Sequence, residues 1–241
     1  MPPIRQTIPV VLFAAALPLA ACRAPSPAPA EPPRWEVPAP SEDRRGATEF
    51  RVAPERSLLT VLVFRGGPLA SLGHNHVIAC RDLAGVVFLM PDRAHSAFEL
   101  RVPVAQLTVD EPALRGAAGA DFAEAVAEDA KADTRRNMLG AALLDADRYP
   151  AITLRSGRIL RTAGGFQLEI AVAVRDQTRS IVVPVTFSEA GEEIVVTGET
   201  RLSQAALGLQ PFSVMLGALQ VEDELHVRFR VTARRAAAAA P

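Results

Sequence analysis

Alternation between large apolar residues and small or polar ones dominates this chain from about residue 50 onwards. From Phe166 to Arg175, large apolar side chains occupy every second position, and Leu225–Val231 repeats this period of two. Strict alternation indicates strands with one buried and one solvated face, as in antiparallel sheets. Seven further segments are candidate strands: 58–64, 74–80, 85–90, 98–102, 151–155, 181–187 and 193–202. Turn residues separate most of these segments, and the pattern predicts an all-β sandwich or barrel.

One stretch, residues 121–144, interrupts the alternation. It is rich in Ala, and Asp121 and Glu124 have the spacing of a helix N-cap and its reciprocal partner. Phe122 and Val126 follow at helical spacing. We expect one or two short helices packed across an opening of the β-structure; the alternative is a helical loop that only fills a gap.

The N-terminus has the features of an export signal. Arg5 precedes the apolar run 8–19, which is shorter than the roughly 20 apolar residues of a membrane-spanning helix and fits a signal peptide. The following Leu-Ala-Ala-Cys, ending at Cys22, resembles the bacterial lipobox, in which the cysteine thiol receives a diacylglyceryl group. We therefore expect residues 1–21 to be a signal peptide and Cys22 to be lipidated. An ordinary secretory signal with a chance cysteine is the alternative.

A lipidated cysteine would anchor the mature protein to a membrane on the periplasmic side of the cell envelope. The next residue is Arg23 rather than Asp, which resembles the outer-membrane sorting pattern of lipoproteins. Residues 22–46 are rich in Pro, Ala and Ser, a composition typical of an extended, disordered linker. We predict the folded domain at 47–235 and a frayed tail at 236–241.

Charge and cysteine content narrow the remaining possibilities. The net charge of −1 does not favour a nucleic-acid partner. The chain has two cysteines, so lipidation of Cys22 would leave Cys80 without a partner and the domain without a disulfide. We interpret Cys80 as a small core residue rather than a nucleophile. Serine-hydrolase elbows, phosphate-binding glycine loops and His-Glu-x-x-His helices are absent from the sequence, and we do not expect an enzyme.

His74 and His76 are two residues apart, which on a regular strand places both side chains on one face about 7 Å apart. That geometry suits two imidazoles on one metal ion, yet a third ligand is not indicated by spacing. Asp82, Glu99, His95 and His226 could reach across a barrel. We weigh metal binding against hydrogen-bonded histidines near the barrel mouth, which we favour, and against contact with the polar head of a ligand.

From Phe50 to Arg234, the order and spacing of motifs resemble the YceI-like family of periplasmic polyisoprenoid-binding proteins. The histidine-bearing segment 73–78 is followed by a polar helical section around 133–138. The most specific match is 144–152, Leu-Asp-Ala-Asp-Arg-Tyr-Pro-Ala-Ile. The sequence departs from the family pattern at Asp176, where a hairpin turn generally has Gly, and in having two histidines instead of one.

This resemblance implies an all-β fold with a short helical insertion: an extended, lipocalin-like antiparallel β-barrel of about eight strands around a long isoprenoid chain. No other cofactor is implied. The alternation predicts which side chains face inward, and these would contact the ligand or, in a filled barrel, only one another: Phe98, Leu100, Phe166, Leu168, Ile170, Ile181, Val183, Val185, Phe187, Val227 and Phe229.

Three functions follow from these observations. The first is a membrane-tethered periplasmic protein that sequesters or carries an isoprenoid or related amphiphilic lipid. The second is a metal-binding module or metal-dependent enzyme that uses His74 and His76. The third is a non-enzymatic envelope interaction protein whose barrel is a filled core.

Overall fold

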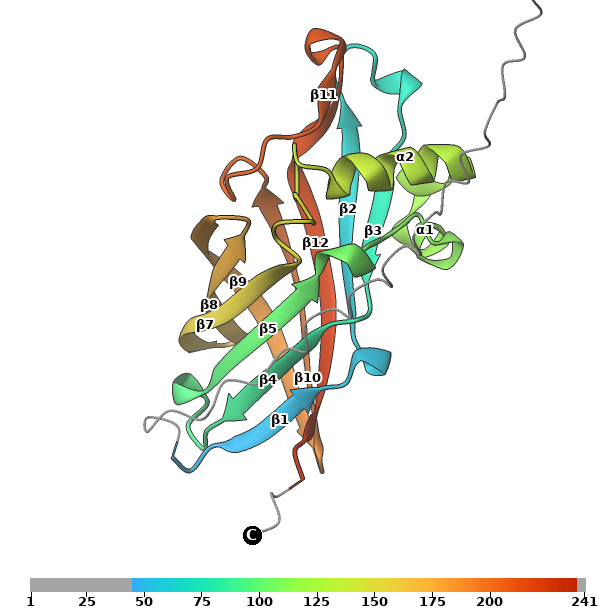
Figure 1. Ribbon diagram of the computed structural model, residues 1–241. Helices are drawn as coiled ribbons and strands as arrows, with labels where there is room; N and C mark the ends of the chain where they lie inside the picture. Colours follow the sequence, from blue (N-terminus) through green and yellow to red (C-terminus); the bar gives the residue numbers. More distant parts are fainter. Residues whose placement is uncertain (1–44, 238–241) are drawn as a thin grey trace, which may run out of the picture. The chain divides into compact units, whose positions relative to one another are not determined.

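The computed structural model describes residues 45–237 (Figure 1). The expected signal peptide, Cys22, most of the linker and the end of the tail lie outside the described residues. The described part contains two α-helices, α1 (Pro112–Ala118) and α2 (Glu128–Leu139). Its strands are β1 (Thr48–Val52), β2 (Leu58–Gly66), β3 (His76–Cys80), β4 (Ala84–Leu89), β5 (Ala97–Pro103), β6 (Thr108–Val109), β7 (Ala151–Thr162), β8 (Gly165–Val174), β9 (Gln177–Ala190), β10 (Glu193–Ser203), β11 (Ser213–Val214) and β12 (Leu219–Arg235).

Eight strands close into an antiparallel barrel. Their hydrogen-bonded order is β1-β4-β5-β7-β8-β9-β10-β12, and β12 pairs back onto β1 to complete the ring. The predicted lipocalin-like barrel of about eight strands is therefore confirmed. Closure leaves the ring without an exposed edge and gives every strand an inner and an outer face, which explains the period of two in the sequence.

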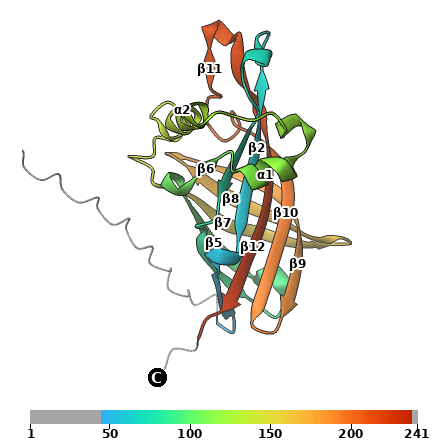
Figure 2. The same cartoon turned by 90° about the vertical axis from the view of Figure 1, so that its right-hand side faces the viewer.

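The barrel extends at one end beyond this ring. The long strand β12 pairs with β1 near its C-terminus and with β2 over Gln220–Arg230. Strand β2 in turn pairs with β3, and β3 with the short β6. Short breaks thus separate three strands of the ring from three strands of the extension. The break at 53–57 separates β1 from β2, the break at 81–83 separates β4 from β3, and the break at 104–107 separates β5 from β6. We call the part formed by β2, β3 and β6 the barrel extension (Figure 2).

The helical insertion covers the barrel extension on both faces. Leu62 and Val77 pack on one face against Phe122, from the 3₁₀ turn after α1. On the other face Ile78 shares the main core with Met138 of α2. Neighbouring residues of a strand point to opposite faces, so the insertion encloses the extension between its two parts.

The region 45–237 includes no helix with the length and apolar character needed to span a membrane.

Three local expectations are wrong. Asp121 is not a helix N-cap; it lies in the 3₁₀ turn Ala120–Phe122, and α2 begins seven residues later without a side-chain cap. α1 precedes the expected insertion. Strand β3 begins at His76, not His74. The Arg65 N–H donates to the Asn75 side chain instead of to a backbone carbonyl of the neighbouring strand, so the pairing with β2 ends at His76.

The turn between β8 and β9 is a tight two-residue hairpin, Arg175-Asp176, as the sequence predicts. Its left-handed residue is, however, Arg175, with φ 53°, and Asp176 has no positive φ. Asp in place of Gly is tolerated because the conformation that favours Gly falls on its neighbour.

Candidate functional site

The barrel encloses a cavity of about 490 Å³. This volume lies in the range of small-molecule binding sites, about 300–1,000 Å³. All the side chains expected to face inward line it: Phe98, Leu100, Phe166, Leu168, Ile170, Ile181, Val183, Val185, Phe187, Val227 and Phe229. The barrel is thus not a filled core. Ligand contact by these residues stays a prediction.

Aliphatic and aromatic side chains form most of the cavity wall. Phe166 and Phe187 meet edge to face, with ring centroids 6.1 Å apart. Gly198 makes room for a third aromatic residue, because a Cβ there would lie 2.5 Å from Cζ of Phe229 and 2.9 Å from the Pro184 carbonyl oxygen. The wall consequently offers an apolar ligand continuous van der Waals contact and few hydrogen-bonding partners.

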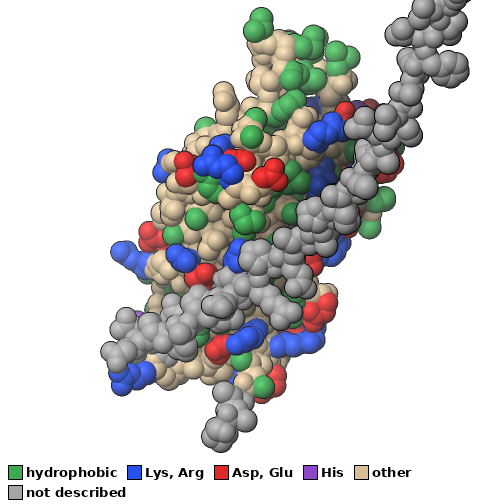
Figure 3. All heavy atoms as spheres, viewed as in Figure 1, with side chains coloured by type: hydrophobic (Ala, Val, Ile, Leu, Met, Phe, Trp, Pro, Cys, Tyr) green, Lys and Arg blue, Asp and Glu red, His purple; other side chains and the backbone are tan. Residues whose placement is uncertain are grey.

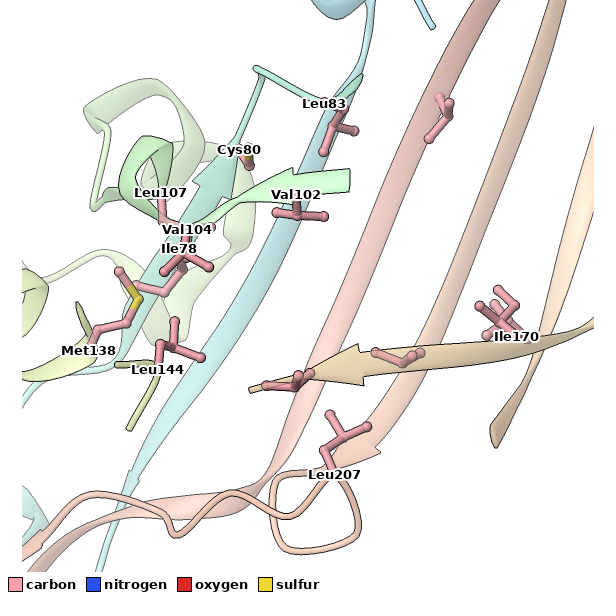
Figure 4. Close-up of a cluster of buried hydrophobic side chains, with 14 of the residues drawn as sticks. Ile78, Cys80, Leu83, Val102, Val104, Leu107, Met138, Leu144, Ile170 and Leu207 are labelled. Carbon is pink, nitrogen blue, oxygen red and sulfur yellow. The ribbon is translucent and has the colours of Figure 1, made fainter. Parts of the chain in front are cut away.

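Helix α2 and the loop after it cover the cavity at the barrel extension. Met138 and Leu144 lie against Ile78 and Val104, whereas Ile170 lies on a strand across the barrel (Figure 4). Thr134 and Asn137, from the same helix, also line the cavity. The insertion therefore places both apolar and polar side chains over this part of the cavity.

A histidine in the cavity wall is held by a buried aspartate behind it. His76 lines the cavity, and its Nδ1 lies 2.7 Å from Oδ2 of Asp110, which is fully buried. The other oxygen of Asp110 accepts the Val77 N–H at 2.8 Å and Arg115 Nη1 at 2.7 Å. Arg115 in turn donates to the carbonyl of Asn75 at 2.7 Å. This network satisfies the buried carboxylate from three directions.

These contacts keep Asp110 ionised. Burial alone would raise the pKa of its carboxyl, but the hydrogen bonds from His76, the Val77 amide and Arg115 together lower that pKa below the usual value of about 3.8. Asp110 has an unusual backbone conformation, with φ 56°, and its N–H donates to the Val77 carbonyl at 2.8 Å. Strand β3 thus holds the residue through both its backbone and its side chain.

The ionised carboxylate determines how His76 can act. A carboxylate only accepts hydrogen bonds, so Nδ1 of His76 carries the ring proton and donates a hydrogen bond to Asp110. In a neutral imidazole, Nε2 is then the acceptor, and it lies 3.3 Å from Oγ1 of Thr134. His76 therefore presents Nε2 to a hydroxyl donor beside an otherwise apolar cavity. This arrangement suits the polar end of an amphiphile.

The sequence model of a protein family, the YceI-like domain, matches residues 78–233, which is well over half of the chain. The chain belongs to the YceI-like family. No curated protein sequence matches it. Among solved structures, BcnA of Burkholderia cenocepacia is similar over 75% of this chain and 98% of its own, with 16% identity and a TM-score of 0.56. This likeness supports the barrel fold.

Two other solved structures have weaker similarity. A polyisoprenoid binding domain from Saccharophagus degradans, implicated in plant cell wall breakdown, has 10% identity and a TM-score of 0.48; the match covers 79% of this chain and 99% of that one. The YCEI protein of Campylobacter jejuni has 10% identity and a TM-score of 0.47, with 65% and 82% covered.

In this YceI-like protein, His74 is placed differently from His76. His74 precedes β3, and its ring centroid lies 6.3 Å from that of His76. Both line the cavity. His74 Nε2 is 3.9 Å from Glu124 Oε1. Residues 45–237 hold no group of three or more His, Cys, Asp or Glu side chains arranged to bind a metal ion, and Nδ1 of His76 is occupied by Asp110.

The possible third metal ligands have other partners. Glu99 pairs with Arg155 at 2.9 Å, His95 with Asp92 at 3.1 Å, and His226 with Glu224 at 3.0 Å. Asp82 lies beside Cys80.

Cys80 is a core residue of this YceI-like fold. Its side chain is fully buried in the main apolar cluster with Ile78 and Leu83 (Figure 4). Burial raises the pKa of the thiol to about 11, despite an opposing hydrogen bond from the Asp82 backbone. The thiol therefore stays protonated at neutral pH and is a poor nucleophile.

Polar side chains also lie near the opposite end of the cavity, but protein partners satisfy them. Arg93 donates to the Met90 carbonyl and pairs with Glu189 at 2.7 Å. Ser96 Oγ accepts the Met90 N–H at 3.0 Å. The nearby Leu89 belongs with Phe50 to a small buried apolar cluster. Of these two polar regions, the one at His76 is better suited to a ligand, because Nε2 of His76 can accept a hydrogen bond from it.

Sequence reasoning missed Asp110, Arg115 and Thr134. They lie 34, 39 and 58 residues after His76 in the chain and meet it only through the fold of the helical insertion. Asp110 directly precedes Glu111-Pro112, which begins α1, so a helix start was the available signal there. Nothing in the local pattern pairs it with His76.

Proposed function

We propose that this protein is a non-enzymatic carrier that holds an isoprenoid or related amphiphilic lipid inside the barrel. The observation that carries the proposal is the apolar cavity of about 490 Å³, whose wall carries a hydrogen-bond acceptor at His76. Burial of a hydrocarbon chain contributes roughly 0.8 kcal/mol per methylene group. An apolar chain would be held along this wall without a polar contact.

The His76 region gives the proposed ligand an orientation. The hydrocarbon chain lies along the phenylalanines and aliphatic residues of β7 to β10, and the head group lies beneath α2. A hydroxyl head donates to Nε2 of His76, taking the place of Thr134 at 3.3 Å. Asn137 lines the same region and offers both a donor and an acceptor to a carbonyl or hydroxyl.

The N-terminal sequence supports the second part of the proposal, a tether on the periplasmic side of the envelope. Acylation of Cys22 would anchor the protein, and the Pro- and Ala-rich segment up to residue 46 would let the barrel move near the membrane. Arg23 favours the outer membrane. A tethered carrier exchanges its lipid with nearby acceptors while remaining in one compartment.

The test uses two neighbouring residues of β9 that point to opposite faces. Ile181 lines the cavity, whereas the side chain of Val182 is 59% exposed outside the barrel. Ile181→Trp fills cavity space and should lower the uptake of a fluorescent isoprenoid at least tenfold. Val182→Trp should leave uptake unchanged. Equal uptake by both variants, with circular dichroism showing both folded, would contradict binding inside the barrel.

A further inference from the structure

Two loops beyond the barrel extension form an exposed apolar tip, which we define as residues 67–73 and 210–218. They connect β2 to β3 and β10 to β12 (Figures 1 and 2). Figure 3 shows hydrophobic side chains gathered at this end of the visible face. The described part of the chain exposes seven large apolar residues, and five of them belong to the tip: Leu72 (67% exposed), Phe212 (38%), Val214 (37%), Met215 (63%) and Leu216 (108%).

A hydrogen bond between the two loops and an unusual backbone conformation fix the structure of the tip. The Leu69 N–H donates to the Ala218 carbonyl at 2.8 Å, which joins the two loops. Gly67 permits this approach, because a Cβ there would lie 2.6 Å from the same oxygen. Met215 and Leu216 have φ values of 53° and 57°, a backbone conformation that residues with long side chains rarely adopt. The fold thus holds large apolar side chains outward instead of burying them.

Charge is missing from the same segments. Neither the stretch between Arg65 and Arg81 nor the stretch between Arg201 and Glu222 contains an Asp, Glu, Lys or Arg. The other two exposed large apolar residues, Leu160 and Val182, lie in β7 and β9. A concentrated apolar patch without charge marks a binding surface.

The shape of the tip favours a lipid bilayer over a protein partner. A stable protein interface takes about 20–30 residues from each side, whereas five apolar side chains on two short loops provide far fewer. Insertion into the interfacial layer of a bilayer needs only a depth of about 5–10 Å and apolar area. The tip has no cationic residue of its own, so insertion should not require anionic lipid.

The tip is continuous with the cavity. Gly73 and Phe212 of the tip, and Leu219 at the start of β12, also line the cavity wall. We propose that the tip inserts into the interface of a lipid bilayer and brings this end of the cavity to the membrane surface. Its use in loading or releasing a lipid rests on the carrier function proposed above; insertion itself does not.

The test is flotation with neutral phosphatidylcholine vesicles, using the full chain with Cys22→Ser so that no acyl anchor contributes. Leu72→Asp with Leu216→Asp should lower the vesicle-bound fraction at least tenfold. Leu160→Asp with Val182→Asp places the same charges on exposed apolar positions of the barrel strands and should leave binding unchanged. Residues 1–44 are identical in the two variants, so a difference in binding between them arises from the substituted positions.

A second measurement locates the inserted residue. In a Trp35→Phe background, Leu216→Trp should shift its emission to the blue with vesicles and be quenched by brominated lipid, whereas Leu160→Trp should do neither. Equal flotation of the two Asp pairs, or no quenching of the tip tryptophan, would overturn the proposal. A dimer that the tip substitutions dissociate, without vesicle binding by the parent, would instead assign the tip to a second copy.

Failure of the carrier function would be distinguishable from failure of insertion. Uptake of a water-soluble, short-chain isoprenoid needs no membrane, so the tip variant should retain it. Loss of uptake in every variant with flotation intact would reject the carrier and leave insertion standing.

Discussion

Asp110 lies behind the cavity wall and holds His76 in place there. Its carboxylate is fully buried, contacts His76 and Arg115, and has a lowered pKa. The geometry of the imidazole therefore depends on a residue that touches no part of the cavity itself.

Replacing Asp110 with Ala leaves His76 Nδ1 without its acceptor and Arg115 without its charged partner. Breaking one side of a buried ion pair costs about 3–5 kcal/mol, and we expect a loss of that size in the free energy of urea unfolding. Asp147→Ala, at an exposed site, should cost less than about 0.5 kcal/mol. Similar losses for both variants would contradict the role given to the network.

The same carboxylate predicts a pH dependence. A lowered folded-state pKa means that the contribution of Asp110 is present above its ordinary pKa, about 3.8, and is lost as pH falls through the folded value. The stability difference between the parent and Asp110→Ala should therefore be constant near neutral pH and shrink below about pH 4. A difference that grew in acid would contradict the assignment.

His76→Ala should weaken binding of an isoprenoid alcohol relative to the hydrocarbon with the same chain. One hydrogen bond is worth about 0.5–1.5 kcal/mol, so the affinity ratio should fall up to about tenfold. His95→Ala, in an exposed turn, should leave the ratio unchanged in the same fluorescence titration. An unchanged ratio in the His76 variant would remove the head group from this site.

Residue by residue, the sequence predicted the cavity wall better than its polar region. The period of two assigns Ile181 inward and Val182 outward, because a strand offers only two faces. The contact between His76 and Asp110 depends on how 34 residues of intervening chain return to β3, and no local period encodes that path.

At the scale of elements, the helical insertion turns an open extension into a covered cavity. Its first part packs Phe122 onto the outer face formed by Leu62 and Val77, and its second packs Met138 onto the inner one. Helix α2 has little apolar character of its own, so it depends on these contacts for its position. The insertion was predictable from broken alternation, but its limits were not, because Asp121–Glu124 imitates a cap inside a 3₁₀ turn.

Phe122→Ala tests how much the first part of the insertion, which covers the outer face, contributes to stability. Removal of a buried Phe side chain costs about 3–5 kcal/mol, and Phe122 is 2% exposed. Phe212→Ala, at a more exposed site, should cost below about 1 kcal/mol. Thermal unfolding measures both. A Phe122 variant as stable as the Phe212 variant would show that the outer cover contributes little to the fold.

For the whole molecule, the ring from β1 to β12 accounts for both the fold and the cavity. Eight strands leave an interior just wide enough for side chains or for one slender ligand, and here the interior is not filled. The sequence was sufficient to predict the all-β class and the barrel, since its alternation and motif order concern every strand. It did not distinguish a filled from an open barrel, because the same apolar residues serve both.

The most direct test of the carrier proposal is mass spectrometry of an organic extract from the full chain with Cys22→Ser, purified from a bacterial envelope. Removing the acylation site prevents anchor lipids from being mistaken for cargo. We predict one hydrophobic species, an isoprenoid or related amphiphile, at about one per protein and at least tenfold less from Ile181→Trp. An empty extract, together with no uptake from a panel of isoprenoids and fatty acids, would contradict the proposal.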